Sequence, residues 1–391
     1  MGDVDGAHLR PTSIYLDHAS TTPLRPQVER VMQSVAREGF ANPSSQHTEG
    51  RRARRILEDS REKILSLLGC SASGPIHHRL LFTSGATESN WSALFGLAHC
   101  ENGTIATSAR DHESLRSAAQ RLSEEFHWDV ETIPLNSHGL IDQNVLNAWL
   151  DTSRSSPQSI LSNTLVCGQT GTIQSRFEIE KRTLLHTDIT QAMSLLCTER
   201  DYSDCATITL APHKFGGPRG IGALLIRSDI DFKPRYFDGT QEQGMRGGTE
   251  AVALAAGFAH ALELTIQERH DMDSRLHSLR NTFESAVRDI ALSRNLDVVI
   301  IGAHEKRSPH ISTIGFSQRD RQAIVLAADL AGLACSSGTA CASGASEPAP
   351  ALLAMNLPKQ LIQGAVRFSF GYTTTDSDVY RAIDILRDVI V

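Results

Sequence analysis

Three segments of this 391-residue chain place reactive side chains directly after a predicted strand. His213 and Lys214 follow the strand-like residues 206–210 and precede a glycine-rich turn. Ligands of open α/β sheets lie beyond the carboxyl ends of strands, and a partly desolvated lysine there can form a Schiff base with an aldehyde. Taken alone, Lys214 is better explained as an ordinary surface charge, because most lysines are surface charges.

The second segment is a turn at residues 83–88 that leaves a strand and enters a predicted helix. The free backbone N–H groups of Gly85, Ala86 and Thr87, together with the helix dipole, would form an anion site suited to phosphate. The alternative is an ordinary helix start that is capped by Ser84 or Thr87.

The third segment ends a strand-like run at residues 183–187 with Asp188. A carboxylate in this place could hold a protonated heteroaromatic nitrogen, which a pyridinium electron sink requires. Asp188 alone could equally be a helix cap. Phosphate donors, a lysine and a carboxylate at three strand ends are harder to explain as structural features.

The pattern around these segments predicts an α/β fold, because strand-like and helix-like runs alternate through most of the chain. We expect a large domain over residues 20–264 with a mainly parallel, seven-stranded sheet, and a smaller α/β domain over residues 1–19 and 265–391. The expected strands of the large sheet are residues 79–83, 104–108, 130–133, 159–166, 183–187, 206–210 and 220–226. Those of the small domain are residues 298–301, 312–316 and 366–370, and the expected helices include residues 250–264 and 269–292.

Composition narrows the class of partner. The chain has 38 Lys and Arg against 45 Asp and Glu, a net charge of −7, which gives no basic field for nucleic acid or anionic lipid. No apolar run is long enough to span a membrane and the first residues do not resemble a signal peptide, so we expect a cytoplasmic protein. The seven cysteines include no C-x-x-C pair, so no metal site is expected.

Seven motifs, in order from about residue 14 to 387, resemble the NifS/IscS-like cysteine desulfurases of the pyridoxal-phosphate-dependent class V aminotransferase family. They are residues 15–23, 42–47, 83–89, 188–191, 213–214, 244–249 and 335–341. The resemblance implies a fold-type-I transferase that acts as a homodimer, converts L-cysteine to L-alanine, and passes the sulfur to an active-site cysteine as a persulfide.

The same resemblance assigns roles to individual residues. Lys214 would carry pyridoxal 5′-phosphate as a Schiff base, Asp188 would pair with the pyridinium nitrogen, and Gln191 would touch the ring hydroxyl. His112 would stack on the ring and shuttle protons. The remaining roles are phosphate binding by Gly85, Ala86, Thr87, His213 and the other subunit's Thr249, and substrate binding by Arg367 and Asn42.

Cys341 matches the cysteine that receives the sulfur, and its neighbours from 336 to 346 are mostly Ser, Gly, Thr and Ala, a composition that predicts a mobile loop. The alternative for Cys341 is a small buried thiol, which is the favoured interpretation of Cys70, Cys100, Cys197 and Cys205. The sulfur acceptor implied by the resemblance is a scaffold for cluster assembly, a tRNA-thiolation relay or a DNA-sulfur-modification partner.

The chain departs from the family pattern in three places. Cys167-Gly168-Gln169 replaces two asparagines and a glutamate, which removes an amide that helps to hold the ring hydroxyl and the substrate carboxylate; Gln169 could compensate in part. Ala211-Pro212 replaces Ser-Gly. Residues 174–188 are too few for a full crossover helix. Two alternatives follow, a related lyase or aminotransferase acting on another amino acid and a non-enzymatic interaction protein.

Overall fold

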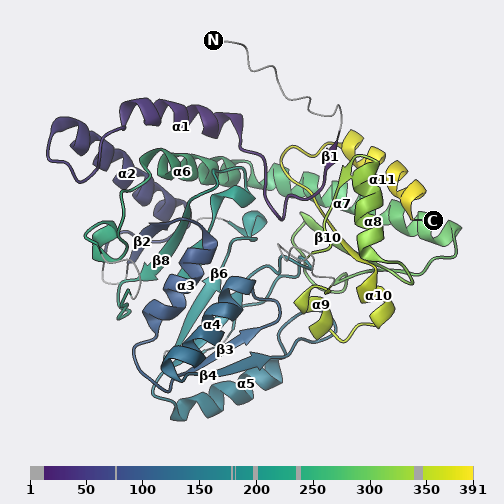
Figure 1. The fold of residues 1–391 in the computed structure, drawn as a ribbon, viewed down its shortest axis with the longest axis horizontal. Helices are drawn as coiled ribbons and strands as arrows, with labels where there is room; N and C mark the ends of the chain where they lie inside the picture. Colours follow the sequence, from purple (N-terminus) through teal and green to yellow (C-terminus); the bar gives the residue numbers. More distant parts are fainter. Residues whose placement is uncertain are drawn as a thin grey trace.

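The computed structural model describes residues 13–74, 77–177, 179–180, 182–196, 201–234, 239–338 and 347–390. Strands and helices alternate along the chain and are arranged in two lobes, a large one that contains β2 to β8 and a smaller one around β10 (Figure 1). The predicted α/β fold with one large and one lesser sheet is confirmed.

The large lobe is built on a seven-stranded sheet in the order β2-β8-β7-β6-β5-β3-β4. Only β8 runs antiparallel to its neighbours. Every residue of β5 and β7 is buried, as expected for strands covered on both faces. The strands are β2 (His78–Thr83), β3 (Thr104–Ser108), β4 (Asp129–Ile133), β5 (Ser159–Thr164), β6 (Thr183–Asp188), β7 (Cys205–Leu210) and β8 (Gly222–Arg227).

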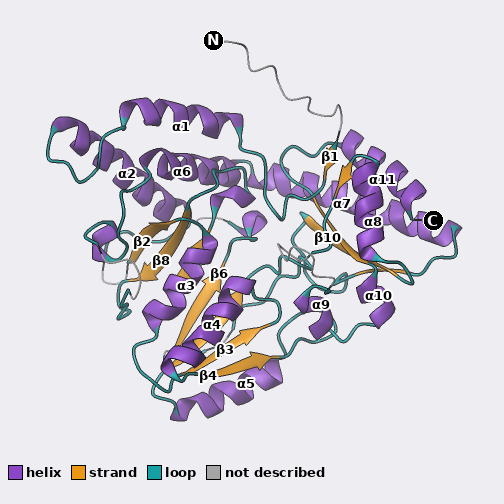
Figure 2. Cartoon of the chain, in the orientation of Figure 1, coloured by secondary structure: helices purple, strands orange, loops and turns teal. Residues whose placement is uncertain are grey.

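Helices cover this sheet in two groups (Figure 2). The helices α1, α2 and α6 pack against one another, and α3 and α4 form a second pair with its own apolar cluster against the sheet. Their bounds are α1 (Pro26–Glu38), α2 (Thr48–Leu67), α3 (Ala86–Leu97), α4 (Glu113–Phe126), α5 (Gln143–Thr152) and α6 (Val252–Gln267). Among the described residues, no helix is both long and apolar enough to cross a lipid bilayer.

The connection from β5 to β6 contains no helix in its described residues, which confirms the truncated crossover. Val166 instead bridges to Ile173, and Thr172 bridges to Arg307 of the small lobe. The chain after β5 therefore contacts the small lobe, instead of forming a crossover helix that would cover the large sheet.

The small lobe contains a three-stranded antiparallel sheet in the order β12-β10-β9. The long helix α7 follows directly after α6, with one residue, Glu268, between the two helices. The elements are α7 (Arg269–Ser293), β9 (Val298–Ile300), β10 (Ile311–Phe316), α8 (Arg321–Leu330), α9 (Pro350–Ala354), α10 (Lys359–Gln363), β12 (Ala365–Ser369) and α11 (Asp376–Val389).

The first described segment joins the two lobes. Its strand β1 (Ile14–Tyr15) pairs in parallel with β11 (Leu333–Ala334) of the small lobe. A few residues later Thr22 donates a backbone hydrogen bond to the carbonyl of His213 in the large lobe (2.9 Å). Residues 16–21 therefore lie between the lobes, beside the carboxyl ends of the large sheet.

Candidate active site

Lys214 lies just beyond the carboxyl end of β7, at the last residue of the 3-10 turn Pro212–Lys214. Proline suits the first position of such a turn because its φ is fixed near the helical value. The Lys214 amine is half-buried and donates hydrogen bonds to the backbone carbonyls of Ala19 (2.8 Å) and Ser20 (2.7 Å). A reactive amine is thus held at the centre of the sheet edge.

Asp188 lies at the end of β6, the strand next to β7. Its carboxylate is buried and accepts hydrogen bonds from the backbone N–H of Thr190 (2.8 Å) and from Nδ2 of Asn90 (2.9 Å). The helix-cap alternative for Asp188 is wrong, because Thr190 lies in a turn and the 3-10 turn that follows begins only at Met193.

Asn90, on the second turn of α3, connects Asp188 to a buried histidine. Its side-chain oxygen contacts Nε2 of His186 (3.1 Å), whose Nδ1 contacts the Thr207 hydroxyl (2.9 Å). Because an amide oxygen can only accept, His186 must carry its proton on Nε2. Burial lowers the pKa of His186 to about 4, although Asp188 opposes this. The two donors to Asp188, a backbone N–H and the Asn90 amide, are uncharged, and the nearby His186 is neutral. The negative charge of Asp188 is therefore available to a cationic ligand.

His112 is the N-cap of α4 and belongs to the same network. Its Nδ1 accepts the backbone N–H of Ser114 (3.2 Å), so the proton of the neutral ring lies on Nε2. The Ser114 hydroxyl in turn accepts a hydrogen bond from Nδ2 of Asn90 (3.0 Å). Burial lowers the pKa of His112, with Lys214 adding to the shift and Asp188 opposing it. His112 is therefore a neutral ring that is linked to Asp188 through two side chains.

The start of α3 has the features expected of an anion site. Gly85 is the N-cap and no side chain caps the helix, so the alternative of a cap from Ser84 or Thr87 is wrong. The Ser84 N–H donates to Glu88 instead (2.7 Å). A Cβ added to Gly85 would find no atom within 4 Å, so there is open space beside the helix start. The first N–H groups of a helix have no intrahelical acceptor and can serve an anion there.

The other predicted phosphate and substrate ligands are less closely joined to this centre. Nδ1 of His213 contacts the Thr21 hydroxyl (3.1 Å), and burial, with Lys214 and Arg219, lowers the pKa of His213 to about 4. Thr249 and Asn42 are both exposed. Within the described chain, neither of these two side chains is hydrogen-bonded to the residues above.

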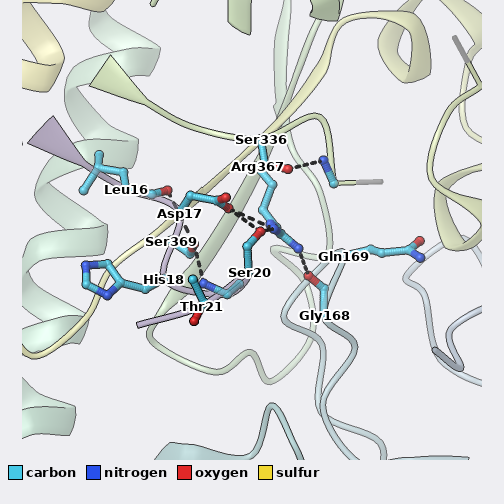
Figure 3. Close-up of polar contacts among 12 residues, drawn as sticks. Leu16, Asp17, His18, Ser20, Thr21, Gly168, Gln169, Ser336, Arg367 and Ser369 are labelled. Atoms are coloured by element: carbon cyan, nitrogen blue, oxygen red, sulfur yellow. Dashed lines mark hydrogen bonds and ion pairs between the residues drawn. The ribbon is translucent and has the colours of Figure 1, made fainter. Parts of the chain in front are cut away.

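Arg367 comes from β12 of the small lobe and points toward the first described segment (Figure 3). It donates to the carbonyl of Gly168 (2.8 Å), to Asp17 Oδ1 (3.0 Å) and to the Ser20 hydroxyl (2.8 Å). These contacts use three of the five guanidinium N–H donors. Its Nε is buried and has no hydrogen-bond partner in the described chain.

Gln169 does not take the place of the missing asparagine in this arrangement. Its side chain is directed away from Arg367 (Figure 3), and its Oε1 accepts the backbone N–H of Ala351 (2.8 Å). On the other side, the backbone of Ser336 forms two hydrogen bonds with that of Arg367 (2.7 and 3.0 Å). Arg367 therefore holds Ser336, before residues 339–346, and Gln169 holds Ala351, after them. Cys341 lies outside the described residues.

Gln191 is the last predicted ligand, and it lies in the turn after β6. Its Nε2 donates to the carbonyl of Ala19 (2.7 Å), which also receives the Lys214 amine. Its Oε1 contacts Nε2 of His310 in the small lobe (3.2 Å). Sequence reasoning missed both His310 and Asn90; the only signal for His310 was its position just before the predicted strand 312–316.

The chain was compared with known families and structures. The family model described as aminotransferase class-V matches residues 14–381. The chain is 33% identical over 387 residues to the cysteine desulfurase IscS of Dictyoglomus turgidum, covering 96% of this chain and 94% of that protein. It is 33% identical over 385 residues to the cysteine desulfurase IscS 1 of Archaeoglobus fulgidus, covering 96% of both.

Solved structures agree with these relatives. A NifS-like protein superimposes with a TM-score of 0.85 at 25% identity, covering 97% of this chain and 99% of that one. A structure described as SspA in complex with cysteine superimposes with a TM-score of 0.74 at 25% identity, covering 92% of this chain and 99% of that one.

Proposed function

This chain belongs to the class V aminotransferase family and is a pyridoxal-phosphate-dependent cysteine desulfurase, and we propose that Lys214 holds its cofactor while Cys341 receives the sulfur. The observation that carries the proposal is the row of three groups at one sheet edge. The Lys214 amine, the uncompensated Asp188 carboxylate and the open start of α3 lie at the ends of strands of the same sheet.

These residues fit pyridoxal phosphate by their chemistry. Asp188 would hold a protonated ring nitrogen, the N–H groups of Gly85, Ala86 and Thr87 would hold the phosphate with His213, and Gln191 would donate to the ring hydroxyl. When bound, the cofactor supplies an electron sink for the carbanion at the substrate Cα.

Lys214 and His112 are placed to move protons. In its uncharged form the Lys214 amine is a base that can take the Cα proton of the substrate. The neutral His112 ring can donate a hydrogen bond from Nε2, since its Nδ1 is held by Ser114, and to shuttle a proton the ring would have to pass through its protonated form. Thr249 from a second copy of the chain would complete the phosphate site, and we therefore propose a homodimer.

Arg367 would bind the carboxylate of L-cysteine. Guanidinium groups bind carboxylates through two parallel N–H donors, and each such pair includes Nη2, so the substrate carboxylate would take the place of Asp17 or Ser20 on Nη2 of Arg367. Asn42 would contribute from the loop between α1 and α2. This places the substrate beside the flanks of the segment that contains Cys341.

The sulfur step uses Cys341 as a thiolate. Its sulfur attacks the sulfur of the substrate, the Cβ–S bond breaks, and the carbon fragment gains protons to leave as alanine. One L-cysteine and one thiol thus give one L-alanine and one persulfide. Cys341 follows Gly338 by three residues. Because an extended chain covers at most about 3.6 Å per residue, the Cα atoms of these two residues can be at most about 11 Å apart. Cys335 is unsuited to this step because burial raises its pKa to about 12.

We further propose that an acceptor protein, a cluster-assembly scaffold or a tRNA-thiolation relay, takes the persulfide sulfur from Cys341. We propose that the protein is cytoplasmic, a compartment in which cysteines such as Cys70 and Cys335 would remain reduced.

The test is a reaction with L-cysteine in which alanine and protein-bound persulfide are both measured. The wild type should form alanine, and persulfide should map to Cys341. Cys341→Ala should lose both products, and Cys335→Ala, the matched control, should retain both. Alanine formation at the wild-type rate by Cys341→Ala would overturn the proposed sulfur step and would favour a related lyase.

A further inference from the structure

His310 precedes β10 and is the only described residue of the small lobe whose side chain is hydrogen-bonded to Gln191. The ring is 1% exposed. Nε2 contacts Oε1 of Gln191 (3.2 Å), and Nδ1 contacts the Ser308 hydroxyl (2.5 Å). The Ser308 hydroxyl also contacts that of Ser194, which follows Gln191 in the large lobe (3.1 Å). The two lobes are therefore joined by a polar chain at this point.

The backbone carbonyl of Ala19 determines where the protons of this chain lie. A carbonyl oxygen can only accept, so the side-chain atom of Gln191 that is 2.7 Å from it must be the amide nitrogen. The amide oxygen then faces His310, whose Nε2 must carry the proton. The Nδ1 of a neutral ring is left as an acceptor for the Ser308 hydroxyl.

The surroundings of His310 keep the ring neutral. Burial, together with the nearby His18, Arg367, Lys214 and Arg280, lowers the pKa of His310 to about 3. A neutral ring has one donor and one acceptor, and both are used in the chain from Ser308 to Gln191. The ring therefore has a fixed tautomer and a fixed orientation.

Resting on the cofactor site proposed above, we propose that His310 is a positioning residue that aims the amide nitrogen of Gln191 at the ring hydroxyl of the cofactor. One Gln191 N–H is used by Ala19, and the second is available to the cofactor. This contact matters more here than in a chain with an asparagine at position 168. A Cβ added to Gly168 would lie 3.5 Å from Nε2 of Gln191, so the missing side chain would have stood beside this amide.

The pH dependence of the absorption band of the Schiff base between Lys214 and the cofactor can be measured. It would not change if the role of His310 were purely structural. A donor to the ring oxygen lowers the basicity of that oxygen, and an ionised ring oxygen stabilises the protonated Schiff-base nitrogen. Loss of the donor should therefore raise the pH midpoint of the band. For a hydrogen bond to a charged group we expect a rise of about one pH unit.

The variants are chosen to separate the donor from the shape of the ring. His310→Phe keeps the ring and removes the donor, so the midpoint should rise and the cofactor dissociation constant should increase about tenfold. His310→Gln places a donor near Nε2 and should restore both values. His304→Phe, at an exposed histidine of the same lobe, is the matched control and should change neither.

A double-mutant cycle with Gln191→Leu tests whether His310 acts through Gln191. In the Gln191→Leu background, His310→Phe should cause no further rise in the pH midpoint of the absorption band. An unchanged midpoint in His310→Phe, or full additivity of the two substitutions, overturns the inference. If His310→Phe does not fold, His310→Met makes the same comparison with His310→Gln. Absence of the band from the wild type would instead overturn the proposed role of Lys214.

Discussion

The cofactor half and the substrate half of the site are built in different ways. Asp188 and His186 come from the strand β6 and Asn90 from the helix α3 of the same lobe, and the three are buried in one hydrogen-bonded network of uncharged donors. Arg367 is held by two separate segments, the first described segment through Asp17 and Ser20 and the loop after β5 through the Gly168 carbonyl.

The difference follows from what each half must do. A cofactor that remains through many turnovers needs a site that does not reorganise, which a network within one sheet provides. A substrate must enter and leave on every turnover, and binding sites for such ligands are often assembled from elements that can move relative to one another. Four substitutions or conditions test this contrast.

The largest effect is expected from Lys214→Ala in the cofactor half. Loss of the only amine at this position should remove both the absorption band and the Cα base, so alanine formation should fall by about 10³-fold or more. Lys233→Ala, at a lysine whose side chain is 61% exposed, should retain wild-type activity. A visible band in Lys214→Ala would mean that another residue binds the cofactor.

Asp188→Asn should have the next largest effect. The substitution replaces the carboxylate with an amide of nearly equal size, so kcat should fall by about 10²-fold while cofactor content is retained through the phosphate site. Cofactor content and turnover are measured together on the same sample. Asp201→Asn, at an exposed loop carboxylate, is the control. Wild-type kcat in Asp188→Asn would show that the ring nitrogen is not held by this residue.

A smaller effect, with the opposite sign, is expected in the substrate half. Gly168→Asn should lower the KM for L-cysteine by about tenfold, because it restores an amide donor near Gln191. The added Cβ would be in ordinary contact with Gln191 at 3.5 Å, so the fold should tolerate it. Gly168→Ala fills the same space without a donor and should leave KM unchanged. Equal KM values for the two variants would contradict the assignment.

The smallest effect is expected on stability against pH. Burial holds the pKa of His310 near 3 and that of His186 near 4, whereas an unfolded chain titrates near 6.5. The unfolded state therefore binds more protons below pH 6.5, and the free energy of unfolding should fall from there down to about pH 3. The melting temperature of His310→Gln should decrease by a few degrees less than that of the wild type over this range. Parallel curves of melting temperature against pH for the wild type and His310→Gln would contradict the burial of a neutral His310 ring.

Much of the fold could be predicted because its signals are local. Buried strands such as β7 appear as apolar runs bounded by turns, and the observed β7, Cys205–Leu210, differs by one residue from the predicted 206–210. The positions of Lys214 and Asp188 at neighbouring strand ends follow from the same pattern. The truncated crossover after β5 was visible in the sequence because too few residues lie between Gln174 and Asp188.

The remaining features depend on contacts between distant segments. Asn90 reaches Asp188 across 98 positions, and His310 reaches Gln191 across 119. No periodicity or spacing encodes such pairs, because each is decided by how the lobes and layers pack. Gln169 illustrates the same limit, since its residue type suggested compensation for the missing asparagine, while its side chain holds the start of α9.

The carbonyl of Ala19 has a consequence for how the holoenzyme is assembled. An ammonium that donates to two carbonyls cannot attack an aldehyde until those bonds are released and a proton is lost, so incorporation of the vitamin has to compete with the segment around Ala19 and Ser20 for the same nitrogen. Damage to this short stretch of the amino-terminal region would then alter how fast newly made protein becomes active, although none of its side chains takes part in bond breaking.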